Sequence, residues 1–265
     1  MATAVQGKKF NLGRGKCLFN RKRTDGTYVG YRFVGNTPRV VITPSQEVVT
    51  ARSAADKVSA VVAEDILSQD YEIEMDANEF IKANLALAFF GEEALYTQAA
   101  TAITDESINA GTAVTGGHYY YTAKREHASI QAVTGPAGTP VYTSPADYTS
   151  DAEDKRLGRI FVVAGGAMDG DVGVIIDYTP TAITNRPFIK AGEATDIEGE
   201  LEFVSDNIRG DNNDFRFWRV KIRSDQAVSL ISNEYGAITL KVRVLGDPER
   251  HPTNQYFEIF ELTAA

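Results

Sequence analysis

The sequence predicts a mainly β protein, and three observations lead to this class. Segments in which apolar and polar residues alternate recur along the chain and are densest over residues 183–262. Turn-forming pairs such as Asp25-Gly26 separate these segments. Tyrosine and phenylalanine occur 12 and 13 times against a single tryptophan, and such aromatic side chains suit pleated surfaces.

The N-terminal part is predicted to contain a hairpin and an edge strand. Residues 1–16 are rich in glycine and lysine and are expected to form an irregular arm. Two strands should follow within residues 17–36, joined at Asp25-Gly26, because Asp-Gly is a strong hairpin signal. Residues 39–50 form a further strand, and Pro44 within it favours a position at the edge of a sheet or a bend.

A loop, a strand and one long helix are expected next. The first part of residues 51–76 is interpreted as a loop, and the alternating tail of this segment, with Tyr71, Ile73 and Met75, as a half-buried strand. The helix should cover residues about 77–90, because apolar residues recur there at helical spacing. Asp76 or Asn78 is the expected cap at its start, Glu79 should lie in its first turn, and Gly91 should end it.

The middle of the chain is predicted to form a small antiparallel sheet. Residues 99–117 are small and polar and are interpreted as a long exposed loop. Strand-like runs follow at 140–143, 159–163 and 172–179, separated by turn residues. The glycine-rich residues 164–170 are interpreted as a hairpin connection between the last two runs.

The last part of the chain is predicted to be almost entirely strand. Residues 198–204 and 214–222 should pair, and three further alternating segments follow at 227–232, 237–245 and 255–262. In the second strand, Phe215 and Phe217 are assigned to one face with Arg219 and Lys221. Since the alternation shifts near Trp218, a β-bulge is expected there.

Composition excludes several classes of function. The net charge of -9 and the pI of about 5.0 disfavour nucleic-acid binding through phosphate neutralisation. Cys17 is the sole cysteine, so no intrachain disulfide and no CxxC metal site can form. The apolar runs are too short to span a bilayer, and the N-terminal residues lack the apolar stretch of a signal peptide. We therefore expect a protein that is made and used in solution.

Several acidic and histidine side chains could in principle take part in catalysis or metal binding. The acidic and amide-rich connection Asp206–Asp214 lacks the EF-hand pattern, because Ile208 and Arg209 interrupt the ligand positions. His118, His127 and His251 have no metal-ligand spacing and are expected at surface or interface positions. The expected solvated loop acids are Asp147, Asp151, Glu153 and Asp154. No catalytic, cofactor-binding or metal-binding residue is predicted, and no cofactor is expected.

Four segments, taken in their order along the chain, resemble the major tail tube proteins of tailed bacteriophages. They are residues 13–45 with Val34-Gly35-Asn36, residues 71–92, residues 140–179 and residues 197–247. The third segment has a Val-Tyr and Asp-Tyr-Thr start, a Gly-Arg-Ile strand and an Asp-Tyr-Thr finish. The order of the segments carries the resemblance, which covers most of the chain.

The resemblance implies a fold, an assembly and a location. It implies an antiparallel β-sandwich or barrel-like tail tube domain over residues 1–111 and 183–265, with residues 112–182 as a small β-rich insertion. Copies would join edge to edge into rings, expected to be hexameric, and the rings would stack into a tube for genome delivery. Residues 1–16 and 45–65 are expected to reach the next ring.

The implied partners are other copies of the chain and other tail proteins, namely a terminator, a tip or baseplate and a tape measure. DNA would pass through an acidic lumen without tight binding, and no membrane contact is implied. The implied location is the virion tail, assembled in the host cytoplasm.

Two other functions remain open from the residues. One is a tail-tip or decoration protein that binds a receptor or carbohydrate, because Tyr119, Tyr120 and Tyr121 could stack on sugars. Consecutive tyrosines in a strand would, however, simply alternate between its two faces. The other is a hydrolase that uses Asp206, Asp211 or Asp214, but no nucleophile–base spacing supports it, so we expect no enzyme.

Overall fold

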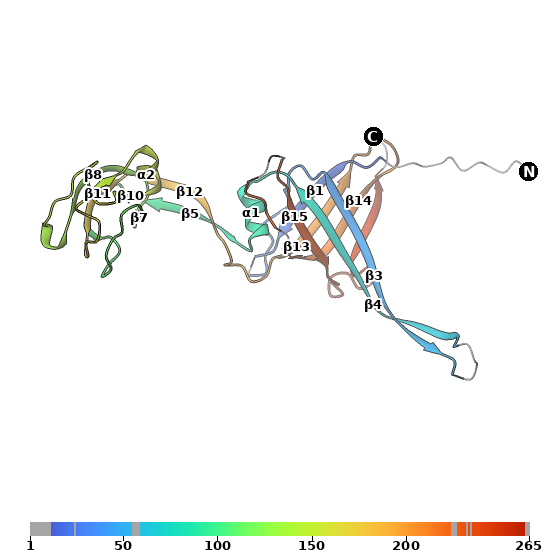
Figure 1. Ribbon diagram of the computed structural model, residues 1–265. Helices are drawn as coiled ribbons and strands as arrows, with labels where there is room; N and C mark the ends of the chain where they lie inside the picture. The colour runs from blue at the N-terminus through green and yellow to red at the C-terminus, as the bar shows by residue number, and fades with distance from the viewer. Residues whose placement is uncertain are drawn as a thin grey trace, which may run out of the picture. The chain divides into compact units, whose positions relative to one another are not determined.

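The computed structural model describes residues 12–23, 25–54, 59–223, 227–231, 233 and 235–262. Residues 1–11 of the expected N-terminal arm and residues 55–58 of the expected 45–65 arm lie outside this part. The described residues form a mainly β protein with several antiparallel sheets, two short α-helices and no closed barrel (Figure 1). The chain divides into two compact units, with Leu95–Phe188 as unit 2 and the remainder as unit 1. The expected insertion, residues 112–182, falls within unit 2.

Unit 1 is built on one antiparallel sheet with eight strands among the described residues. Its order is β2-β1-β13-β14-β15-β4-β3, and β16 pairs with the part of β14 that β15 leaves free. The strands are β1 Gly15–Arg21, β2 Arg32–Phe33, β3 Arg39–Arg52, β4 Val61–Ala77, β13 Glu198–Ser205, β14 Asn212–Arg223, β15 Ile238–Val244 and β16 Phe257–Leu262. The terminal position of β3 confirms the edge predicted from Pro44.

The core of unit 1 lies on one face of this sheet. Ile73 and Met75 of β4 and Leu240 and Val242 of β15 are buried on that face, while the residues between them remain partly accessible. Alternation with period two therefore separates an apolar face from a polar face, as the sequence predicts. Helix α1, Lys82–Ala88, contributes Leu87 and Ala88 to the same core.

Helix α1 is shorter than the predicted helix at 77–90. Asp76 still belongs to β4, and the helix begins after Ile81, whose backbone is extended with φ -73° and ψ 153°. The predicted caps Asp76 and Asn78 are therefore wrong, and Glu79 precedes the helix. Pairing of β4 with β15 up to Ala77, followed by the hydrogen bond from the Asn78 N–H to the Asn36 carbonyl, ties the start of the predicted helix to other segments and so delays the helix.

The predicted bulge near Trp218 is confirmed. Leu201 pairs with Phe217 and Gly199 pairs with Val220, so Glu200 lies opposite both Trp218 and Arg219. The extra residue shifts the alternation of β14, and the buried positions change from Phe217 to Val220 and Ile222. The predicted grouping of Arg219 and Lys221 with Phe215 and Phe217 is therefore wrong, because the bulge turns these cations to the polar face.

The hairpin after β1 turns at Asp25-Gly26 as predicted, with φ +85° at Gly26 and a hydrogen bond from the Gly26 N–H to the Arg23 carbonyl. The interpretation of the first part of residues 51–76 as a loop is wrong where β3 continues to Arg52 and where β4 begins at Val61. The predicted strand at 227–232 is also wrong, because residues 227–231 form no strand and Ser232 lies outside the described part.

Unit 2 contains two small antiparallel sheets. One has the order β7-β10-β9 and the other the order β6-β11-β8. The strands are β6 Ile103–Ser107, β7 Tyr119–Tyr121, β8 His127–Thr134, β9 Tyr148–Thr149, β10 Arg159–Val162 and β11 Ile175–Pro180. A 3-10 turn at Pro136–Gly138 and helix α2, Ala152–Leu157, complete the unit. Strands β5, Glu92–Gln98, and β12, Ile183–Lys190, pair with each other and carry the chain into and out of unit 2.

Three predictions for the middle of the chain are wrong. Residues 164–170 do not form a hairpin connection, because β10 and β11 belong to different sheets. Residues 140–143 form no strand, and Val141 makes a single bridge to Thr134. Residues 99–117 are not one exposed loop, because they contain β6 and the buried Ile108 and Val114.

Neither helix, nor any other helix in the described part of the chain, has the length and apolar character that a membrane crossing requires.

Gly199 is predicted to be intolerant of a side chain. A Cβ atom at this position would lie 2.4 Å from the Asn20 carbonyl oxygen and 2.7 Å from the Phe19 ring. We expect Gly199→Ala to lower the free energy of unfolding by about 1–3 kcal/mol, because no space is left beside the bulge. Gly13→Ala is the matched control, since its nearest atom would be 3.9 Å away. Equal denaturant midpoints for the two variants would contradict this account.

Candidate assembly surfaces and the polar cluster at the strand bulge

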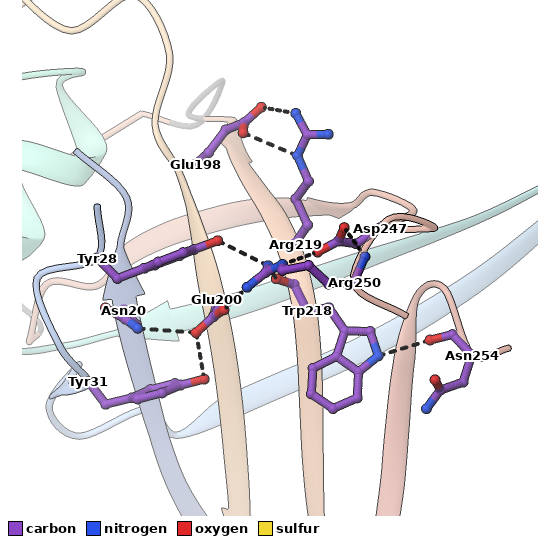
Figure 2. Close-up of polar contacts among 10 residues, drawn as sticks. All are labelled: Asn20, Tyr28, Tyr31, Glu198, Glu200, Trp218, Arg219, Asp247, Arg250 and Asn254. Atoms are coloured by element: carbon purple, nitrogen blue, oxygen red, sulfur yellow. Dashed lines mark hydrogen bonds and ion pairs between the residues drawn. The ribbon is translucent and has the colours of Figure 1, made fainter. Parts of the chain in front are cut away.

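A polar cluster occupies the polar face of the sheet at the bulge (Figure 2). Glu200 is its centre. Its Oε2 accepts hydrogen bonds from Asn20 Nδ2 at 3.1 Å and from the Tyr31 hydroxyl at 3.0 Å, and its Oε1 accepts one from Arg250 Nη1 at 2.8 Å. Burial and then the charge of Glu200 raise the pKa of Tyr31, so this hydroxyl remains a donor.

Arg250 joins the loop between β15 and β16 to this cluster. Its guanidinium donates to Asp247 Oδ2 at 2.6 Å, to the Tyr28 hydroxyl at 3.0 Å and to the Trp218 carbonyl at 3.0 Å. Partial burial alone would lower the pKa of Arg250, but the hydrogen bonds to Glu200 and Asp247 outweigh it and raise that pKa. The guanidinium therefore stays charged and holds the loop against the bulge.

Trp218 holds the same loop at a second point. Its indole Nε1 donates to the Asn254 carbonyl at 2.9 Å, and its ring stacks on His251 with the centroids 3.8 Å apart. A shallow hollow of about 320 Å³ lies beside this stack, lined also by Tyr31, Glu202 and Arg216. Within the described residues no three His, Cys, Asp or Glu side chains are grouped to hold a metal ion. The cluster is therefore best explained as a clamp on the loop.

Charged side chains form matched columns over the rest of the polar face. Carboxylates lie on β13, just before it and on β4, and cations lie on β14 and β15 between these strands and on β3. The ion pairs are Arg219–Glu198 at 2.9 Å, Arg216–Glu202 at 3.3 Å, Lys221–Asp196 at 2.9 Å, Arg243–Asp70 at 2.9 Å and Arg39–Asp76 at 3.6 Å. Most cations of this face are thus already neutralised within the chain.

The outer part of the β3–β4 hairpin leaves the sheet as a free ribbon (Figure 1). Strand β15 ends opposite Tyr71, so residues 45–52 and 61–70 pair only with each other among the described residues. We call these residues the arm. Its eight residues on β3 extend about 26 Å at ~3.3 Å per residue. Most of its side chains are exposed on both faces.

The arm exposes an unusual amount of apolar surface. Val62, Ile66 and Leu67 are 64%, 59% and 61% exposed, and Val48, Val49 and Val61 are exposed as well. A two-stranded hairpin without further packing is only marginally stable in water. Contiguous exposed apolar surface of this kind marks an interaction site.

Three strands of the main sheet also have a free edge among the described residues. Strands β2 and β3 are the ends of the sheet, and β16 pairs on one side only. Strand β16 also exposes Ile259, Phe260 and Leu262. Such edges present unpaired N–H and C=O groups to any neighbouring strand, and monomeric proteins usually block them.

The connection Asp206–Asp214 is structural in this geometry. Strands β13 and β14 pair as predicted, and the polar atoms of the connection bind its own backbone, with Asn207 Nδ2 donating to the Asp211 carbonyl at 2.7 Å. Asp214 does not belong to the exposed connection, because it lies in β14 and is buried. Its Oδ2 accepts from Arg216 Nε at 2.7 Å, whereas its buried Oδ1 has no hydrogen-bond partner in the described residues. Burial and then Asp214 raise the pKa of Glu202 nearby.

The acids of unit 2 are only partly the solvated loop acids that the sequence predicts. Asp151 and Glu153 are exposed, but Asp147 and Asp154 are buried. Asp147 accepts from the Thr143 and Ala167 backbone N–H groups, and these bonds lower its pKa. Asp151 caps α2 by accepting from the Asp154 N–H at 2.8 Å. These carboxylates organise loops and a helix start.

The histidines and tyrosines singled out in the sequence do not meet at one site. His118 is exposed, but His127 is buried against Tyr178, so its predicted surface position is wrong. Burial lowers the pKa of His127. Tyr119 and Tyr121 are exposed, whereas Tyr120 packs toward the core of unit 2, which confirms the alternation. Arg159 covers the Tyr119 ring at 3.9 Å from its centroid.

The fold and these surfaces define a mainly β protein with an open sheet, free edges and a projecting arm. Residues 10–259 match a family described as protein of unknown function UCP028589, and the chain belongs to this family. No curated protein matches the chain.

Arg250 is predicted to hold the 245–256 loop by its geometry as well as its charge. We expect Arg250→Lys to lower the free energy of unfolding by about 1 kcal/mol and to speed proteolysis in this loop, because an ammonium cannot reach the same acceptors together. Arg223→Lys, at an exposed arginine of β14, is the control and should change neither property. Indistinguishable proteolysis rates for the two variants would show that the charge alone suffices.

Proposed function

We propose that this protein is a self-assembling structural subunit of a bacteriophage tail tube. In this proposal its copies form stacked rings, and the rings enclose a conduit for genome delivery. The observation that carries the proposal is the open antiparallel sheet, whose free edges and projecting apolar arm are unsuited to a monomer. The order of the four segments that resemble tail tube proteins supports the same assignment.

Assembly would satisfy the exposed groups of the isolated chain. A neighbouring copy placed beside a free edge would provide partners for its unpaired backbone N–H and C=O groups. It would also cover apolar side chains such as Phe260 on β16. Contacts between different surfaces of identical copies close into rings or continue into filaments, and a tube combines both.

The barrel that the expected fold implies would then be formed by several copies together. The sheet is open within one chain, so closure would require several copies joined edge to edge. The resemblance implies hexameric rings. The two halves of unit 1 would supply the tube-forming domain, and we assign no role to unit 2 in the wall.

The charges of the polar face suit passage of DNA. Tight DNA binding requires cations that neutralise phosphates and release counterions. Arg216, Arg219, Lys221, Arg243 and Arg250 each have a carboxylate partner within the chain. A wall with this face toward the lumen would offer little to hold DNA. The proposed partners are other copies and other tail proteins, the proposed location is the virion tail, and no enzymatic activity forms part of the proposal.

Self-assembly is tested by negative-stain electron microscopy of the purified protein over a concentration series. We expect rings and tubes of uniform width that become more abundant as concentration rises, because edge pairing is an association between copies. The same preparation should sediment as assemblies in analytical ultracentrifugation. A strictly monomeric protein at every concentration, together with its absence from the tube of any particle that carries it, would contradict the proposal.

A further inference from the structure

The arm is acidic as well as apolar. Its described residues, 45–52 and 61–70, contain four carboxylates and one cation, which gives a net charge of 4 − 1 = 3 negative charges. The carboxylates are Glu47, Glu64, Asp65 and Asp70, and the cation is Arg52. Asp70 pairs with Arg243 where the arm begins. A partner for the arm should therefore combine apolar surface with positive charge.

One region of unit 1 has this combination. Residues 21–32, which we call the basic rim, contain four cations and one carboxylate, which gives a net charge of 4 − 1 = 3 positive charges. Lys22 and Arg23 form no ion pair among the described residues, although hydrogen bonds and then the charge of Arg23 lower the pKa of Asp25. Val29 and Tyr31 are exposed beside them.

The basic rim also borders a concave surface. A groove of about 1030 Å³ is lined by Arg21, Lys22, Arg23, Val29 and Arg32 on the side of the rim. Five carboxylates outside the rim also line the groove. Glu93 acts electrostatically on Arg32, and the other four have cationic partners in the chain. They are Glu92 with Arg21, Glu193 with Lys190, Asp196 with Lys221 and Glu198 with Arg219. Lys22 and Arg23 are thus the two cations of the rim that no lining carboxylate outside the rim pairs with, and they could meet an acidic ligand.

The register of the sheet keeps the arm and the rim of one chain apart. A single row of cross-strand partners crosses the sheet through Arg21, Gly199, Val220, Val244, Tyr71 and Pro44. From this row the arm extends along the β3 edge. Its direction is the one that runs along β1 from Arg21 to Gly15. The described residues of the rim turn, 22–23 and 25–28, extend in the opposite direction from the β2 edge. The two surfaces therefore lie at opposite ends and opposite edges of unit 1.

We propose that the arm of one copy docks on the basic rim of a second copy in the adjacent ring. This inference rests on the proposed function and adds the surface that receives the arm. The apolar side chains of the arm would cover Val29 and Tyr31, and Glu64 and Asp65 would approach Lys22 and Arg23. Because the arm and rim lie at opposite ends along the strands, the contact joins copies head to tail and continues without closing.

A charge exchange tests this contact. Glu64→Lys with Asp65→Lys should abolish tubes while isolated rings persist in electron micrographs, because like charges would then face each other at the contact. Lys22→Glu with Arg23→Glu should have the same effect. All four changes in one chain should restore tubes, since the charges again match. Glu249→Lys, at an exposed carboxylate outside both surfaces, is the control and should leave the tubes intact.

Cross-linking between copies provides a second readout. Cys17 is fully buried, so the native background can be kept. A mixture of the Leu67→Cys and Val29→Cys proteins should give a disulfide-linked dimer under mild oxidation, and each variant alone should give none. Dimers of Leu67→Cys with itself would indicate arm-to-arm contact and would overturn the inference.

The failure of this inference and that of the proposed function have different signatures. Tubes that survive the arm charge reversal, or a fourfold variant that assembles no better than the arm variant, would overturn the arm–rim contact and leave the tube proposal intact. A wild-type protein that never forms rings or tubes would overturn both. Circular dichroism of each variant should match that of the wild type, so that a loss of tubes reflects the contact.

Discussion

Unpaired backbone groups along the edges of one open sheet are the constraint on which this molecule depends. Strand β3 has 14 residues and pairs on one side only among the described residues, and its outer half projects beyond the sheet together with the outer part of β4. Backbone N–H and C=O groups are satisfied by water in the monomer, but a neighbouring strand satisfies them at least as well while covering apolar side chains. The exposed valine, isoleucine and leucine side chains of the arm would likewise be stabilised by burial against a neighbouring copy. The geometry of the single chain therefore supports the proposed association between copies.

The bulge opposite Glu200 allows one strand to serve two purposes. Before the bulge, Phe215 and Phe217 face the core, and after it Val220 and Ile222 do so. The same shift places Trp218 and Arg219 together on the polar face, where Trp218 binds the 245–256 loop. Without the extra residue, the residues after the bulge would face the opposite side of the sheet. Val220 and Ile222 would then lie on the polar face, and Arg219 and Lys221 would point into the core.

The sequence allowed the strands of the main sheet to be predicted well, because their alternation reflects burial on one face. The edge position of β3 followed from Pro44, and the bulge followed from the shift at Trp218. The predicted start of the helix was wrong because β4 pairs up to Ala77 and Asn78 is hydrogen-bonded to Asn36. Helix α2 was missed although its signals, Asp151 at the start and Gly158 at the end, are both present in the sequence.

The polar cluster could not be predicted, because Asn20, Glu200 and Arg250 are far apart in the chain and meet only through the sheet register. Likewise, the length of the arm depends on where β15 ends.

Hydrogen exchange measured on the monomer and on the assembled protein tests the central claim most directly. The account predicts that the outward amides of β3 exchange quickly in the monomer and become protected on assembly, because they gain partners from another copy. Amides within helix α1 provide the internal control, since their partners lie in the same chain, and they should not change. Assemblies in which β3 and the arm exchange as fast as in the monomer would contradict the claim that these free edges join the copies.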